Sequence, residues 1–196
     1  MNKETAPGQD VVPVVSEKRI PVHCSVLFLR FVLYLAILVV GLSLDLGTKS
    51  WIFERLGLPG ENATWWIVDD VFGFQTSLNQ GALFGMGQGK VHLFALFSFV
   101  AIGGILVWLL FFRALSSLFL TVVLGMLSAG ILGNLYDRLG LHGLKWDDAP
   151  VYAVRDWILV MIGHWPWPNF NIADSLLVCG AILLALFAFF SKEDVF

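Results

Sequence analysis

The segment that decides the fold is Ile172–Phe190, which reads IADSLLVCGAILLALFAFF and contains a single charged residue, Asp174. A bilayer core about 30 Å thick is crossed by a helix of roughly 20 mostly apolar residues. The segment therefore predicts a membrane-spanning helix with a carboxylate in its first turn. A charged group at a membrane helix is costly and is usually retained for a function. Asp174 is consequently the first candidate site residue.

The composition of the whole chain agrees with a membrane protein. Of the 196 residues, 58% are hydrophobic and 14% are charged, and the mean hydropathy is +0.79. Soluble domains average about 45–50% apolar and about 25% charged residues. The net charge of −3 gives no support to nucleic-acid binding, which usually shows as a basic patch. The two cysteines, Cys24 and Cys179, are too few and too far apart for a disulfide scaffold.

Three further segments are long and apolar enough to cross a bilayer, at about 25–44, 91–112 and 115–136. Short aromatic and β-branched runs at 65–68 and 71–74 favour strands. The predicted fold is an all-α membrane bundle of four transmembrane helices with a small β-sheet at the membrane surface.

The predicted domain organisation is a polar tail at 1–24, a single membrane domain at 25–191 and a short tail at 192–196. With four spans, the connections 45–90 and 137–171 lie on one side of the membrane and both tails on the other. Each side has six Lys and Arg residues, but the tail side holds them in far fewer positions. That density favours the tail side as cytoplasmic.

Polar residues gather at both ends of the connection 45–90. Asp45 and Lys49 are four residues apart, so on a helix they share a face and can pair. An ion pair that only stabilises the helix and a role toward substrate both remain open for them. The stretch from Asn79 to Gly85 combines an amide with glycines, which can approach a peptide closely, although such a stretch alone is typical of a turn.

A third cluster, Gly133-Asn134-Leu135-Tyr136-Asp137-Arg138, ends the third span. Asn134 and Arg138 share a helical face, and we expect them to contact substrate carbonyl groups. Asp137 is adjacent to Arg138, and we expect it to form a structural ion pair, because ionisable groups at membrane depth usually pair.

The fourth cluster comprises Asp156, Asn171 and Asp174. Two carboxylates brought together do not both ionise easily, so one of them keeps a proton. Such a pair supplies a base to activate water and an acid to polarise a carbonyl and protonate the leaving amine. We expect residues 157–170, with Gly163 and two prolines, to form a loop that folds back and lets the aspartates meet.

In this order and at these helix ends, the four clusters resemble the lipoprotein signal peptidase (signal peptidase II) family over about residues 30–190. The most specific stretches are Gly133–Arg138 and Phe170–Asp174. The resemblance implies an aspartic endopeptidase of the bacterial inner membrane, with four spans and both termini cytoplasmic. By the same resemblance, the active site is expected at the outer face, and the small sheet is expected to be an extracytoplasmic cradle for substrate. It also implies cleavage of prolipoprotein signal peptides before a cysteine that carries diacylglycerol.

The resemblance further implies a reaction with two aspartates, no metal and no cofactor. Carried over by position, the catalytic residues are Asp156 and Asp174. Implied partners are diacylglyceryl-modified prolipoproteins, membrane lipid and globomycin-type inhibitors, and we expect a monomer. The substrate-binding residues implied by position are Asp45, Lys49, Asn79, Gly81, Asn134, Arg138 and Asn171.

Two features depart from the family pattern. Arg155 stands before the first catalytic aspartate, where the family usually has an apolar residue. An inward-pointing Arg155 would alter the pKa of its neighbour, and an outward-pointing one would do little. Residues 140–150 look like an insertion that brings Asp147 and Asp148, but Asp156 is preferred because bulky apolar residues follow it as in the family.

Three other chemistries fit the sequence less well than a pair of aspartates. A serine–lysine peptidase would use Lys49 with Ser50, but sequence neighbours do not face each other on a helix. A small transporter or proton-relay protein also uses membrane carboxylates, but its pathway should leave polar residues along the length of the helices. Metal catalysis is disfavoured because the four histidines are scattered and no HExxH motif exists.

Overall fold

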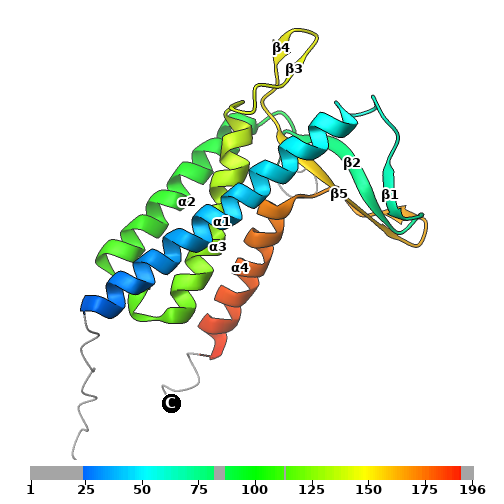
Figure 1. The fold of residues 1–196 in the computed structure, drawn as a ribbon. Coiled ribbons are helices and arrows are strands. Elements are labelled where there is room, and N and C mark those ends of the chain that lie inside the picture. Colours follow the sequence, from blue (N-terminus) through cyan, green and yellow to red (C-terminus); the bar gives the residue numbers. More distant parts are fainter. Residues whose placement is uncertain (1–23, 82–86, 113, 191–196) are drawn as a thin grey trace, which may run out of the picture.

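The computed structural model describes residues 24–81, 87–112 and 114–190. Four helices, α1 (Cys24–Leu56), α2 (Val91–Phe111), α3 (Leu118–Arg138) and α4 (Ile172–Phe190), lie side by side in a bundle (Figure 1). Each contains an 18-residue window with a hydropathy of 2.0 to 2.5, as needed to cross a membrane. The predicted four-helix membrane fold is confirmed. The predicted tails lie outside the described residues, apart from Cys24.

Helix α3 forms the centre of the bundle. In its apolar window 61% of the residues are buried, against 11% in each of the other three helices. Glycines allow this close packing, since a Cβ on Gly130 would lie 2.6 Å from the carbonyl oxygen of Ala173 in α4. A Cβ on Gly133 would overlap the carboxylate of Asp45 in α1. These contacts bring the polar residues of three helices together at one end of the bundle.

Helix α1 is longer than the predicted span at 25–44. Its 33 residues correspond to roughly 50 Å of helix, more than a bilayer core requires. The helix continues because no proline interrupts it, and it ends at Gly57, whose φ of +72° is left-handed. Asp45 and Lys49 therefore lie within α1 instead of at its end.

Helix α3 begins at Leu118, three residues after the predicted start at 115. A 3-10 turn at Ala114–Ser116 comes first, and the Ser117 side chain then accepts a hydrogen bond from the N–H of Leu120 at 3.3 Å. This is a conventional N-cap. Arg30 of α1 donates hydrogen bonds to the carbonyl oxygens of Leu115 and Ser116 and so holds the turn between α2 and α3.

An antiparallel sheet lies beside the end of α1 and the start of α4 (Figure 1). Strands β1 (Trp65–Val68) and β2 (Phe72–Asn79) confirm the predicted strands. The sheet order is β1-β2-β5-β6, with β5 at Val154–Ile162 and β6 at Trp165–Pro166. The predicted loop at 157–170 was wrong over most of its length, because the bulky apolar residues after Asp156 pair with β2.

The predicted insertion contains a separate hairpin, β3 (Lys145–Trp146) and β4 (Ala149–Pro150), which projects beyond the helices (Figure 1). Asp147 and Asp148 form its turn, with φ of 48° and 62°. Two consecutive residues with positive φ are typical of a two-residue hairpin turn, which favours Asp and Asn.

The sheet is attached to α1 by an apolar cluster. Trp157 of β5 packs with Ile52 and Phe53 of α1, and its ring centroid lies 5.2 Å from that of Phe74 in β2. Side chains alternate between the two faces of a strand. With Trp157 directed toward α1, the adjacent Asp156 is directed to the opposite face.

Candidate active site

Helix α4 starts with a reciprocal cap that fixes Asp174. The N–H of Asp174 donates to Oδ1 of Asn171 at 2.9 Å, and the N–H of Asn171 donates to Oδ2 of Asp174 at 3.2 Å. This arrangement matches a capping box, in which the N-cap and third helical residues exchange hydrogen bonds. The spacing Asn-x-x-Asp before an apolar run is a sequence signal of this cap. The carboxylate is thus held at the helix mouth by local structure.

Asp156 reaches the same place from the sheet. Its Oδ1 accepts a hydrogen bond of 2.6 Å from Nδ2 of Asn171. The side chain of Asn79, at the end of β2, also hydrogen-bonds Asp156. Antiparallel pairing makes this possible, because Asn79 lies opposite Val154, two residues from Asp156 and on the same face.

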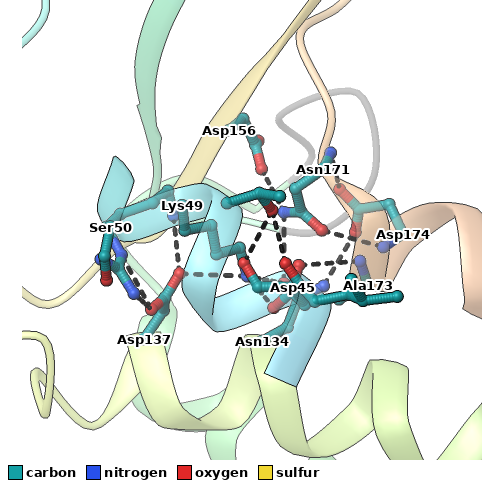
Figure 2. A network of polar contacts seen from close by, with 12 residues as sticks. Asp45, Lys49, Ser50, Asn134, Asp137, Asp156, Asn171, Ala173 and Asp174 are labelled. Atoms are coloured by element: carbon teal, nitrogen blue, oxygen red, sulfur yellow. Dashed lines mark hydrogen bonds and ion pairs between the residues drawn. The ribbon is translucent and has the colours of Figure 1, made fainter. Parts of the chain in front are cut away.

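Asn134 of α3 joins the two aspartates (Figure 2). Its Nδ2 donates to Oδ1 of Asp174 at 2.8 Å, and its Oδ1 accepts from Nδ2 of Asn171 at 3.2 Å. Asn171 in turn binds Asp156. The structure thereby connects Asp156 and Asp174, eighteen residues apart in sequence, through two asparagine side chains.

A layer of charges lies behind the asparagines. Lys49 Nζ binds Oδ2 of Asp45 at 2.7 Å and Oδ1 of Asn134 at 3.0 Å. Asp45 Oδ1 accepts from the N–H of Ala173 at 2.9 Å, next to Asp174. Asp45 and Lys49 are completely buried and form the ion pair that their spacing allowed. They reach the aspartates only through neighbours, so this structure shows no surface on either that a substrate can touch.

Asp137 forms an ion pair, as predicted, but with different partners. Its carboxylate lies 2.9 Å from Nη2 of Arg155 and 3.2 Å from Nζ of Lys49. Arg138 instead donates to the carbonyl oxygen of Gly81 at 3.2 Å. No local pattern in the sequence indicates the pairing of Asp137 with Arg155, because the two residues belong to different elements.

Arg138 and Asn79 together fix the chain at Gly81. The guanidinium of Arg138 also lies over the ring of Phe94 in α2, 5.8 Å from its centroid. Asn79 Oδ1 accepts from the N–H of Gly81 at 2.9 Å. The remainder of the predicted stretch to Gly85 lies outside the described residues.

Arg155, the two hairpin aspartates and Ser50 do not contact Asp156 or Asp174 through their side chains in any hydrogen bond of the described residues. Arg155 points inward, but its charge is directed to Asp137 and away from Asp156. Asp147 and Asp148 are exposed at the hairpin turn, away from the aspartate pair. Ser50 accepts a hydrogen bond from Arg155 at 3.2 Å, and Lys49 Nζ is bound by other groups, so the serine–lysine arrangement is absent between these two residues.

Metal-binding groups show no clustering in the described part of the chain. There, no three His, Cys, Asp or Glu side chains gather in a way that would hold a metal ion.

Burial and the nearby charge of Asp174 raise the pKa of Asp156 from 3.8 to about 8. Hydrogen bonds from Asn171 and Asn79 act in the opposite direction but are weaker. Near neutral pH, the aspartate pair therefore holds a proton on one member. One carboxylate and one carboxylic acid, here linked through Asn171 and Asn134, are the two groups that general acid–base hydrolysis uses.

The raised pKa of Asp156 predicts how hydrolysis by this aspartate pair would depend on pH. Because the raised pKa means that the proton is lost as pH rises, we expect kcat/KM to fall as pH rises through about 8. The measurement is a pH–rate profile with the folded state checked at each pH by tryptophan fluorescence. A profile that stays flat to about pH 9.5 would show that a protonated aspartate is not needed.

The chain is similar to known proteins over most of its length. The profile of the family described as Signal peptidase (SPase) II matches residues 37–190. A lipoprotein signal peptidase of Rhodopirellula baltica is 47% identical over 166 residues, which cover 82% of this chain and 73% of that protein. A lipoprotein signal peptidase of Clostridium novyi is 34% identical over 152 residues, which cover 77% of this chain and 93% of that protein.

Solved structures show the same fold. A bacterial membrane enzyme determined by the in meso method at 2.3 Å resolution superposes with a TM-score of 0.70 at 24% identity, over 83% of this chain and 91% of that one. A second such enzyme, at 1.9 Å resolution, gives a TM-score of 0.63 at 26% identity, over 78% and 90%. With four membrane-spanning helices and a sequence match over most of its length, the chain belongs to the signal peptidase II family of proteases.

Proposed function

We propose that this protein removes signal peptides from bacterial prolipoproteins, cleaving before a diacylglyceryl-modified cysteine, with Asp156 and Asp174 as the catalytic pair. The observation that carries the proposal is the junction of the two carboxylates through Asn171 and Asn134 at the mouth of α4. The family of the chain and the names of its relatives support the substrate class.

In the proposed reaction the two aspartates share one proton. The ionised member takes a proton from water, and the resulting hydroxide attacks the scissile carbonyl carbon. The protonated member polarises the carbonyl oxygen and later supplies the proton that the leaving amine requires. The raised pKa of Asp156 fits a pair that is singly protonated near neutral pH. The two titrate as one unit, so the proton belongs to the pair.

The remaining residues divide into contact and support. Asn79, Gly81 and Arg138 hydrogen-bond one another at the end of β2. An extended peptide would exchange these bonds for bonds to its own backbone, and Arg138 Nε, which has no hydrogen-bond partner among the described residues, is a donor for its carbonyl groups. Asn134 and Asn171 hold the carboxylates. Asp45 and Lys49 were predicted to contact substrate, but both are completely buried. They instead hold Ala173 and Asn134, which are next to Asp174 or bound to it.

The membrane arrangement follows from the same proposal. Both termini lie in the cytoplasm, and the sheet and the aspartates lie at the outer face of the inner membrane, where lipid-modified substrates are held. We propose a monomer that is inhibited by globomycin-type compounds, which occupy the same site.

The proposed function is tested with purified protein in detergent. A precursor with a diacylglyceryl-modified cysteine is compared with the same precursor in unmodified form. We expect cleavage directly before the modified cysteine, identified by mass spectrometry, and inhibition of that cleavage by globomycin. An intact lipidated precursor, under conditions in which the protein remains folded, would refute the proposal.

Metal dependence provides a separate prediction. Because the aspartates themselves activate the water, we expect the cleavage rate to be unchanged by EDTA or 1,10-phenanthroline. The measurement is the initial rate before and after incubation with each chelator and dialysis. A rate that falls and returns when Zn²⁺ or Mg²⁺ is added would contradict a reaction that depends on the aspartates alone.

A further inference from the structure

Arg155 is adjacent to Asp156 in β5 but faces the other side of the strand, toward α1 and α3. The residue is buried, with 3% of its surface exposed. Nε and Nη2 donate to Oδ1 of Asp137 at 3.1 and 2.9 Å, and the backbone N–H donates to Oδ2 of Asp137 at 3.0 Å. Nη1 donates to Ser50 Oγ at 3.2 Å. One carboxylate thus holds both the backbone and the side chain of the residue before Asp156.

Arg155 also completes a balance of buried charges. Asp45, Lys49 and Asp137 are completely buried, and with Arg155 they comprise two anions and two cations. Buried charges are tolerated only when they are paired. Without the charge of Arg155, Lys49 would be the single cation between two carboxylates. Its ammonium group would then be drawn toward Asp137, which it already approaches at 3.2 Å.

The position of Lys49 matters because it orients Asn134. Oδ1 of Asn134 accepts from Lys49 Nζ at 3.0 Å, which leaves Nδ2 to donate to Asp174 at 2.8 Å (Figure 2). Oδ1 also accepts from Asn171, which binds Asp156. If Lys49 moves toward Asp137, the amide of Asn134 loses the contact that fixes its orientation, and both aspartates lose a defined partner.

We propose that Arg155 is a positioning residue for the aspartate pair: by neutralising Asp137 it leaves Lys49 bound to Asp45 and Asn134. This inference rests on the proposed function, because it assigns a role toward Asp156 and Asp174. Arg155 does not touch the reacting atoms. Its effect reaches them through Asp137, Lys49 and Asn134, and its backbone N–H bond to Asp137 holds β5 at the residue before Asp156.

The test compares Arg155→Gln, which removes the charge, with Arg155→Lys, which keeps it. Because a small misplacement of catalytic groups is costly, we expect Arg155→Gln to lower kcat by about 10- to 100-fold while KM changes by less than about threefold. Arg155→Lys is expected to keep kcat within about fivefold of the unsubstituted protein. A purely structural role would lower the amount of folded protein but leave kcat per folded molecule unchanged.

A double variant tests the route through Asp137. In Asp137→Asn/Arg155→Gln the buried charges are again balanced, so Lys49 is left with Asp45 and Asn134. We expect its kcat to return to within about fivefold of the unsubstituted value. Arg55→Gln is the matched control, because Arg55 is exposed on α1 and stacks over Trp51 and Trp65, outside the network.

Three outcomes would overturn the inference. They are an Arg155→Gln variant with undiminished kcat, an Arg155→Lys variant as impaired as Arg155→Gln, and a double variant with no recovery. If Arg155→Gln does not fold, a kcat more than about fivefold below the unsubstituted value in either the Arg155→Lys or the double variant overturns the inference. Failure of the proposed function is distinguishable, because it would show as full activity in Asp156→Asn or Asp174→Asn, whatever Arg155 does.

Discussion

Asp156→Asn and Asp174→Asn are each expected to reduce the cleavage of a lipidated precursor by about 10²- to 10⁴-fold, the usual contribution of general acid–base catalysis. Asparagine keeps the shape of the side chain but neither ionises nor donates an acidic proton. The amide keeps one acceptor oxygen for a hydrogen bond from Asn171 or Asn134 and gives up the other, so the variants are expected to fold with lower stability. The measurement is kcat with saturating substrate, with the amount of folded protein determined by size-exclusion chromatography.

Asp147→Asn and Asp148→Asn are the matched controls for this experiment. Both residues lie exposed in the hairpin turn with positive φ, a conformation that asparagine also adopts readily. We expect both to leave kcat unchanged. Full activity in Asp156→Asn or in Asp174→Asn would exclude that residue from the catalytic pair, and loss of activity in Asp148→Asn would point to the hairpin instead.

Lys49→Met is expected to destabilise the protein by about 3–5 kcal/mol, the usual cost of removing one partner from a buried ion pair. The change leaves Asp45 and Asp137, both completely buried, with Arg155 as the remaining cation of the group. Methionine has a similar volume, so the loss reflects charge and hydrogen bonding more than packing. The measurement is the free energy of unfolding in detergent, followed by tryptophan fluorescence.

Lys90→Met serves as the matched control, because Lys90 is an exposed lysine that precedes α2. A surface substitution of this kind usually changes the free energy of unfolding by less than about 0.5 kcal/mol. Equal stability of Lys49→Met and the unsubstituted protein would contradict the role of Lys49 as the cation that holds the buried carboxylates. A stability loss in both variants would point to a general effect of removing lysines.

The four helices and the strands β1 and β2 were predictable because their signals are local. An apolar run of about 20 residues commits a segment to the membrane whatever lies around it, and four such runs gave four helices. Strands β1 and β2 followed from short aromatic and β-branched runs. The length of α1 was not predicted, because hydropathy marks where a helix leaves the bilayer and not where it ends. Its end is set by the backbone conformation of Gly57.

The candidate site was predictable as a set of residues but not as a geometry. The motifs named Asp156, Asp174, Asn134 and Asn171, and the structure joins these four by hydrogen bonds. We expected the chain between Asp156 and Asp174 to be a loop at 157–170 that folds back. Most of this segment is instead a hairpin. Strand β5 continues past Asp156, the chain turns at Gly163, and β6 leads it back toward the start of α4.

By itself the sequence determined that the chain spans a membrane four times and where its polar groups stand along the helices, because hydropathy and helical spacing act over a few neighbouring residues. Only the tertiary structure decided which charges pair. Asp137 pairs with Arg155 and not with its sequence neighbour Arg138. Lys49 lies between the carboxylates of Asp45 and Asp137 and the side chain of Asn134. Buried charges must find opposite charges wherever packing brings them, and packing joins elements far apart in the chain.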